Sequence, residues 1–198
     1  MHSFVRTFVA IAMLLVGASA RAEQPALDHR SLVKMNDGVL WIGDGQMERA
    51  DWPRFVIAGL LLARGDDGVR YSRAGLERST AADASIWAGR QTLTLRASLI
   101  FASFGHEDGA LLRTPMPPGF ENPTDAALDA ARARYDEGLT AMVEALRSRR
   151  VRTVVLFGPA AVDELEPASA GVHVGYNATL RGISNRTRDF AERESLPF

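Results

Sequence analysis

Residues 38–49 read Gly-Val-Leu-Trp-Ile-Gly-Asp-Gly-Gln-Met-Glu-Arg, an apolar run of strand length that meets a Gly-Asp-Gly turn. An apolar run without polar alternation is typical of a parallel strand that is buried on both faces of a sheet. In open α/β sheets, ligands bind at the edge where the carboxyl ends of such strands meet. The stretch therefore predicts a central strand over 38–42 that delivers a sharp loop to that edge.

Three further segments have the pattern of strands. Residues 69–74 alternate in polarity, which predicts a half-exposed strand at or near a sheet edge. Residues 96–104 and 151–157 also have strand patterns, and each is followed by a glycine. The final residues, 196–198, look like the beginning of a fifth strand.

Helical patterns follow these strands. The first is a helix from 52 to about 64, with Phe55, Val56, Leu60 and Ala63 at helical spacing. The second is a short helix that is capped by Thr80 and ends near Trp87, and the third is a long helix capped by Thr124. A last helix is marked by Tyr176, Leu180, Ile183 and Phe190. Residues 109–123 are rich in Gly and Pro and predict a long surface loop. The alternation predicts an α/β fold, a parallel sheet of about four strands with helices on both faces.

The first 22 residues have the pattern of a secretory signal peptide. A short basic start is followed by an apolar run over 8–17 and by small residues before cleavage near Ala20 or Ala22. We therefore expect a secreted or periplasmic protein with one domain over 23–198 and no membrane partner after cleavage. The chain has no cysteine, so a disulfide framework is excluded. Its net charge of −1 gives no reason to expect a nucleic acid or an anionic membrane as partner.

Small or polar residues follow three of the predicted strands, and we expect them to meet at one edge of the sheet: Gly43-Asp44-Gly45, Ala74-Gly75 and Gly105-His106-Glu107-Asp108. In this order and spacing the chain resembles the SGNH (GDSL-type) hydrolases over residues 39–198, and more narrowly their divergent members in planctomycete-type bacteria. The resemblance implies a flavodoxin-like three-layer sandwich and ester hydrolysis on carbohydrate or lipid substrates.

The resemblance also assigns a slot to each of these residues. Asp44 matches the aspartate of the Gly-Asp-Ser block, and Gly45 stands where that block has the serine nucleophile. Gly75 matches the glycine whose backbone N–H serves the oxyanion hole, and Glu107 stands in the slot of the asparagine donor. A carboxylate there would repel an oxyanion, and loss of one donor costs about 3–4 kcal/mol. The Asp-x-x-His block, which follows the fifth strand in the family, has no counterpart in the 198 residues.

Residues 106–108 allow other interpretations. Three consecutive residues of an extended chain cannot all face one ion, so we predict no metal. His106 oriented by Asp108 is a hypothesis for a general base that activates water. The dinucleotide fingerprint lacks its third glycine, because Glu48 occupies that position, so no cofactor is expected.

Two functions remain open at this stage. One is a hydrolase with an impaired or altered mechanism. The other is a non-catalytic protein that binds an acylated glycan, a small-molecule ester or a protein partner in the same cleft. A shortened or frameshifted product of a longer gene is a further alternative. With the fifth strand missing, we expect the fourth strand to expose an apolar row at the sheet edge, which would favour self-association.

Overall fold

The structure is a computed structural model that describes residues 32–49, 51–64, 68–113, 116, 119–149, 151–162 and 175–198. The predicted signal peptide and its cleavage positions lie outside these residues. Within them, no helix is both long and apolar enough to cross a bilayer.

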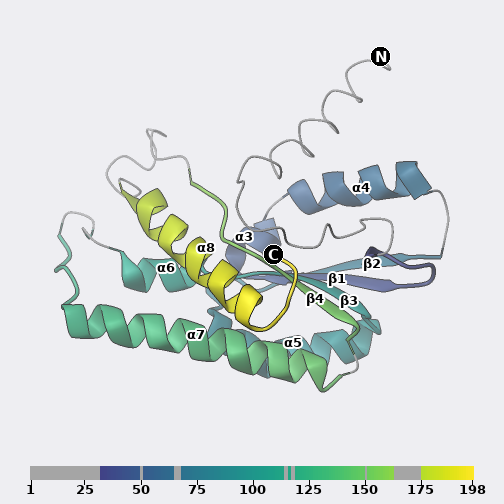
Figure 1. Ribbon diagram of the computed structural model, residues 1–198. Helices are drawn as coiled ribbons and strands as arrows, with labels where there is room; N and C mark the ends of the chain where they lie inside the picture. The colour runs from purple at the N-terminus through teal and green to yellow at the C-terminus, as the bar shows by residue number, and fades with distance from the viewer. Residues whose placement is uncertain are drawn as a thin grey trace, which may run out of the picture.

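The centre of the fold is a parallel sheet of four strands (Figure 1). In chain order the strands are β1 (Gly38–Gly43), β2 (Arg70–Gly75), β3 (Leu99–Ser103) and β4 (Thr153–Phe157). Their spatial order is β2-β1-β3-β4. The predicted central strand is therefore confirmed as β1, and the alternating segment is confirmed as an edge strand, β2.

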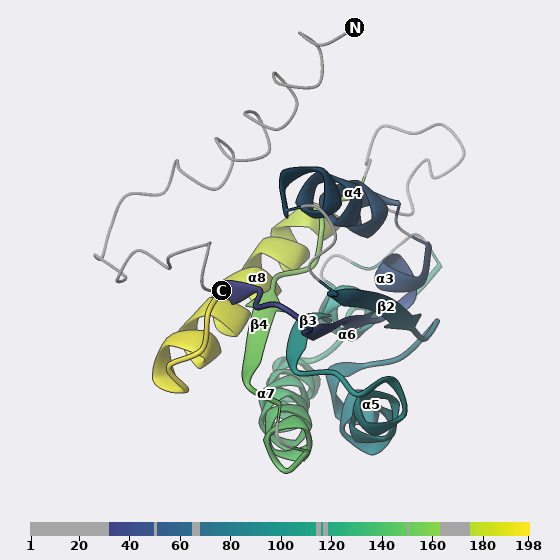
Figure 2. The ribbon, with the colours of Figure 1, turned by 90° about the vertical axis from the view of Figure 1, so that its right-hand side faces the viewer.

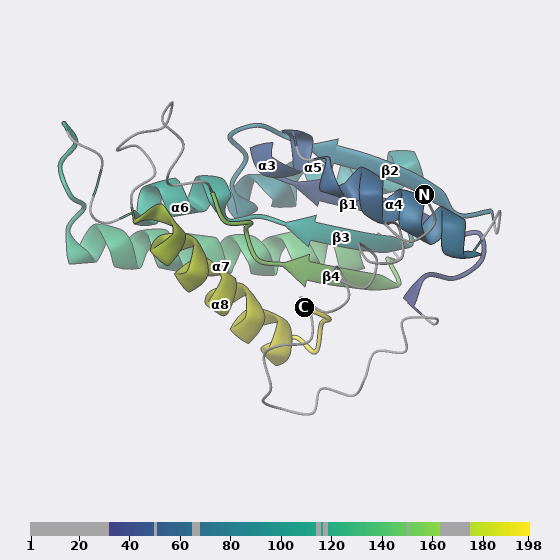
Figure 3. The same ribbon diagram turned by 90° about the horizontal axis from the view of Figure 1, so that it is seen from above.

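Helices cover both faces of the sheet, which confirms the three-layer α/β architecture (Figure 2). The helices are α3 (Gly45–Arg49), α4 (Trp52–Arg64), α5 (Ala81–Leu95), α6 (His106–Leu112), α7 (Asp125–Arg147) and α8 (Tyr176–Arg193). In Figure 2, α4 lies on one side of the sheet, and α5 and α7 lie on the other. Figure 3 shows α8 running alongside β4.

The two faces of the sheet form two separate apolar clusters because successive side chains of a strand point to opposite faces. On one face, Leu40 and Ile42 of β1 pack in a cluster with residues of α5, α7 and α8. On the other face, Val39 and Trp41 pack with Met47 of α3 and with Ile57 of α4. The buried position of Trp41 agrees with the prediction from the apolar run.

Several predicted boundaries need correction. The helix capped by Thr80 has the expected capping box with Asp83, but it continues past Trp87 to Leu95. Arg96 follows in the left-handed conformation that ends this helix, so β3 begins only at Leu99. The predicted loop over 109–123 is also too long, because residues 106–112 form α6.

The fourth strand lies at a sheet edge, as expected, but the expected exposed apolar row is wrong. Val154, Val155 and Leu156 are all buried. The backbone N–H of Leu156 donates to the carbonyl of Pro197 at 2.9 Å, and Leu196 and Phe198 pack against the neighbouring cluster. The last residues of the chain therefore cover part of this edge, and the basis for predicting self-association there is weaker.

Candidate functional site

The three strand ends meet as the sequence predicts. Gly43, the last residue of β1, is in register with Gly75 of β2 on one side and with Ser103 of β3 on the other. The backbone N–H of Asp44 donates to the carbonyl of Ser103 at 3.4 Å, and the N–H of Leu76 donates to the carbonyl of Gly43 at 3.1 Å. The loops after these strands therefore start side by side at one edge of the sheet.

Asp44 holds two of these loops together. Its side chain is only 2% exposed, and its two carboxylate oxygens accept hydrogen bonds from different elements. Oδ2 accepts from the backbone N–H of His106 at 2.9 Å, at the first residue of α6, and Oδ1 accepts from that of Gln46 at 3.0 Å. Burial raises the pKa of Asp44, against the two backbone hydrogen bonds, which act to lower it.

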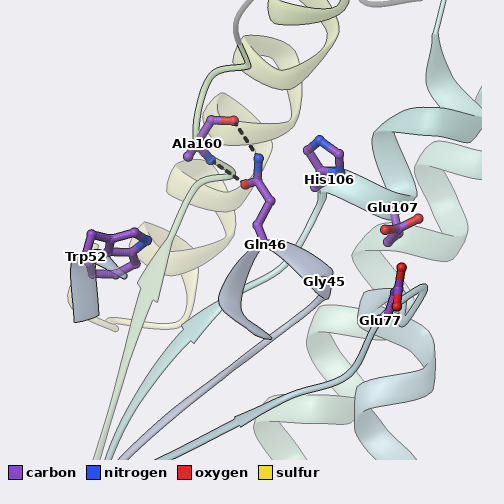
Figure 4. Close-up of a pocket in the computed structure, with 7 residues that line it drawn as sticks. All are labelled: Gly45, Gln46, Trp52, Glu77, His106, Glu107 and Ala160. Atoms are coloured by element: carbon purple, nitrogen blue, oxygen red, sulfur yellow. Dashed lines mark hydrogen bonds between the residues drawn. The ribbon is translucent and has the colours of Figure 1, made fainter. Parts of the chain in front are cut away.

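A pocket of about 340 Å³ opens directly in front of Gly45 (Figure 4). It is lined by Gly45, Gln46, Trp52, Glu77, His106, Glu107 and Ala160. The structure thus brings together three of the residues predicted for the site, which are Gly45, His106 and Glu107. Trp52 borders the pocket, whereas the indole N–H of Trp87 donates to the hydroxyl of Ser79 at 3.0 Å and Trp87 does not line it.

Two carboxylates stand at the place where a side chain of residue 45 would project. A Cβ added to Gly45 would lie 3.5 Å from Oε1 of Glu107 and 3.6 Å from Cγ of Glu77, which are ordinary contact distances. Figure 4 shows both carboxylates on the same side of the pocket. The position is therefore open to a larger side chain, and its surroundings offer hydrogen-bond acceptors.

Glu77 was missed in the sequence because it lies in a loop without a motif, two residues after Gly75. Gln46 and Ala160 were missed for a different reason. The side-chain amide of Gln46 pairs with the backbone of Ala160, accepting from its N–H at 3.2 Å and donating to its carbonyl at 3.5 Å. This pairing between distant segments has no local signal in the sequence.

A second amide pairs with the same segment after β4. Asn177, the second residue of α8, accepts from the N–H of Val162 at 2.8 Å and donates to its carbonyl at 2.9 Å. Gln46 and Asn177, which we call the amide pair, therefore both hold the segment after β4, and of the residues in these contacts Gln46 and Ala160 line the pocket.

Gly75 does not line the pocket. It packs instead against the backbone of α3, where an added Cβ would lie 2.5 Å from Cα and 2.6 Å from Cβ of Glu48. Real Cβ atoms essentially never approach other atoms within 3.0 Å, so the glycine is required by this close approach. The donor role implied for its backbone N–H remains a prediction.

His106 and Asp108 do not form the pair that was suggested. Both lie in α6, but His106 lines the pocket while the Asp108 carboxylate is buried and accepts from the backbone N–H of Ala81, the first residue of α5, at 3.1 Å. Residues two apart on a helix point in different directions. The His106 ring instead meets the ring of Tyr176 edge-on, with centroids 5.3 Å apart, and the Tyr176 hydroxyl donates to the His106 carbonyl.

Asp108 lends the fold a measurable pH dependence. Burial is the main cause that raises its pKa to about 6, well above the ordinary value of 3.8. The folded state therefore binds this proton more tightly than the unfolded chain does. The resulting stabilisation is complete below pH 4 and is lost as the pH rises through 6. Above that pH the ionised carboxylate costs on the order of 3 kcal/mol of folding free energy.

We expect Asp108→Asn to stabilise the protein at pH 8 by about 1–3 kcal/mol, because the amide oxygen still accepts from Ala81 and carries no charge. At pH 4 the variant and the parent should have nearly equal stability. Urea unfolding of both proteins between pH 4 and 8 measures the difference and cancels the other titrating groups. A difference that does not change with pH would contradict this assignment.

Within the part of the chain that the structure describes, no group of three or more His, Cys, Asp or Glu residues is arranged to hold a metal ion. The carboxylates of Glu77 and Glu107 and the imidazole of His106 are left as the ionisable groups of the pocket. They can accept hydrogen bonds from hydroxyl groups of a ligand, with the indole of Trp52 as an apolar surface beside them.

No model of a known protein family matches the chain, and no curated protein matches it by sequence. Solved structures do match. A gut microbial diltiazem-metabolizing enzyme superposes with a TM-score of 0.69 at 14% identity, over 83% of this chain but only 36% of that one.

Two other matches cover most of both chains. A catalytic mutant of Axe2, an acetylxylan esterase from Geobacillus stearothermophilus, has a TM-score of 0.63 at 14% identity, over 83% of this chain and 76% of that one. A GDSL-like lipase from Bacteroides thetaiotaomicron has a TM-score of 0.55 at 16% identity, over 84% and 69%. The chain has the three-layer α/β fold of this esterase and this lipase.

Proposed function

We propose that this chain is an exported protein that binds an ester of a carbohydrate or lipid in the pocket at Gly45 and does not hydrolyse it by a serine mechanism. The observation that carries the proposal is the geometry at Gly45, which follows β1 at the meeting point of the strand ends and has no side chain. Removal of the nucleophile from a hydrolytic triad costs on the order of a millionfold in turnover.

The lining of the pocket supports binding rather than acyl transfer. Glu107 presents a carboxylate oxygen near the open position at Gly45, where an ester hydrolase needs donors for a developing negative charge. Carboxylates are good partners for the hydroxyl groups of a sugar, and an exposed indole such as that of Trp52 supplies the apolar contact. An acylated sugar offers both kinds of group, so it is the ligand class that we favour.

A hydrolase that activates water is the second candidate. His106 favours it, because its imidazole lines the same pocket and histidine is the commonest general base. In such a reaction the imidazole would take a proton from water, the water oxygen would attack the acyl carbon, and the alkoxide would leave with that proton. This candidate predicts that turnover depends on His106.

The two candidates are separated by measuring turnover and binding on one preparation. With p-nitrophenyl acetate, we expect no hydrolysis above that of the buffer, and His106→Ala should leave the rate unchanged. With acetylated xylo-oligosaccharides, we expect binding detectable by calorimetry, weakened about tenfold or more by Glu107→Ala through the loss of a charged hydrogen-bond acceptor. Leu111→Ala, at an exposed side chain outside the pocket, is the matched control.

Turnover that disappears in His106→Ala would replace the binding proposal by the hydrolase. Absence of both turnover and binding would reject an acylated sugar as the ligand. An ester with a longer acyl chain, such as p-nitrophenyl octanoate, tests the lipid alternative under the same conditions.

A further inference from the structure

Helix α4 is apolar on more than the side that faces the sheet. Pro53 is buried, and Ile57 packs against the cluster around Trp41. Yet the opposite side of the helix is also apolar. A helix that is hydrophobic all round is normally enclosed by protein or lipid, but α4 forms the outer layer on its side of the sheet (Figure 2). Among the residues that the structure describes, nothing encloses the large apolar side chains on its outward side.

The outward side carries one continuous stripe, whose first residue, Trp52, turns partly toward the sheet and is only 37% exposed. Trp52, Phe55, Val56 and Leu62 follow each other at intervals of three, one and six residues, which places them on one face of a helix, with Gly59 between them. Phe55 is 75% exposed and Leu62 is 80% exposed. Large exposed apolar side chains that gather in one patch mark an interaction surface. We call these four side chains the α4 stripe.

The charges on α4 suit a lipid surface. The helix contains two arginines, Arg54 and Arg64, and no acidic residue. The neighbouring acid, Asp51, lies before the helix and pairs with Arg54 at 3.3 Å on the surface. A short helix with Trp, Phe and Leu on one face and arginine as its only charge has the composition of helices that lie in the interface of a bilayer. The chain's near-zero net charge does not oppose this, because insertion depends on the local apolar area.

The stripe is continuous with the pocket. Trp52 is its first residue, and the same indole lines the pocket at Gly45 (Figure 4). The ring is also anchored in the fold, because it meets Trp41 edge-on with centroids 5.1 Å apart. A surface that receives the α4 stripe would therefore lie next to the mouth of the pocket.

We propose that the α4 stripe adsorbs to the surface of a lipid bilayer and presents the pocket at that surface. The side chains of the stripe enter the boundary between headgroups and acyl chains, and Arg54 contacts the phosphates of anionic lipids. The helix lies on the membrane and does not cross it. The proposal does not depend on which ligand the pocket binds.

The test is cosedimentation with lipid vesicles, using the chain as processed on export by an expressing cell. We expect binding to vesicles of phosphatidylcholine mixed with phosphatidylglycerol, and a partition coefficient that falls about tenfold or more in the double variant Phe55→Ser/Leu62→Ser. The matched control is Ile86→Ser/Leu93→Ser on α5, where the side chains are also exposed, 79% and 54%, but lie on the other side of the sheet. The control should bind like the parent.

Fluorescence locates the contact. Brominated lipids should quench the emission of Trp52, and the quenching should be absent in Trp52→Phe. Circular dichroism should show that the two double serine variants melt at the parent temperature, because the changed side chains are exposed. Equal partition of the two double variants, or no binding to any vesicle, would overturn the proposal. A dimer in solution that Phe55→Ser/Leu62→Ser dissociates would overturn it too, since a second copy would then cover the stripe.

Discussion

Replacing Asp44 with alanine is expected to lower the free energy of unfolding by about 3–5 kcal/mol, because two partly buried backbone N–H groups lose their acceptor at once. These are the N–H of His106, which starts α6, and the N–H of Gln46 in α3. The loss should also disturb the pocket, since His106 and Gln46 both line it. Urea unfolding at pH 7 measures the change.

Asp44→Asn provides the graded comparison. An amide has one acceptor oxygen, so it can keep one of the two hydrogen bonds but turns an N–H toward the other donor. We expect the free energy of unfolding of Asp44→Asn to lie between those of the parent and of Asp44→Ala. Because the pKa of Asp44 is raised, removal of its charge offsets part of the lost stability. Asp108→Asn should have the opposite sign. If Asp44→Ala unfolded at the same urea concentration as the parent, the linking role of this carboxylate would be refuted.

The second large effect is expected from Gly75→Ala, a change of one methyl group that should destabilise the protein by about 2–4 kcal/mol through overpacking. The new Cβ would meet the backbone of Glu48, and a helix backbone cannot rotate away as a side chain can. Helix α3 would have to move away from β2, and Gly45 at its start would move with it. Thermal unfolding reports the stability, and ligand titration reports the displacement of the pocket.

Two glycines on neighbouring helices serve as controls. Gly45→Ala places its Cβ at ordinary contact distances, and Gly59→Ala meets no atom within 4 Å. Neither should cost stability, and the latter should add about 1 kcal/mol because alanine is the better residue inside a helix. A Gly75→Ala variant as stable as these two would mean that α3 is free to shift.

The sequence was sufficient to predict the strands that build the site and the edge of the sheet at which they end. A buried parallel strand is recognisable from its continuous apolar residues, and parallel strands necessarily end at the same edge of the sheet. The meeting of Gly45, His106 and Glu107 in one pocket therefore follows from the order of three strands. The start of α7 at Thr124 was also predictable, because its cap is local.

What could not be predicted depends on contacts between distant residues. Helix α6 starts at His106, where the carboxylate of Asp44, 62 residues away in the sequence, accepts the first N–H of the helix. The residues next to His106 give no signal of this contact. Asp108 looked like a partner for His106 as long as residues 106–108 were treated as a loop, but in a helix the two side chains diverge. Glu77 and Ala160 enter the pocket only because their loops leave the same edge of the sheet.

The amide pair has a consequence for the chemical ageing of the protein. Asn177 donates to the carbonyl of Val162, and Gln46 donates to that of Ala160. Hydrolysis of either side-chain amide would replace its N–H donor with a carboxylate oxygen, which would face the backbone carbonyl oxygen of Val162 or Ala160. The two oxygens repel each other, so the segment after β4 would move away from the side chain that holds it. Stored protein is therefore expected to lose the shape of the pocket while the sheet and its helices remain folded, so that spectroscopic signs of folding would overestimate the fraction of intact pockets.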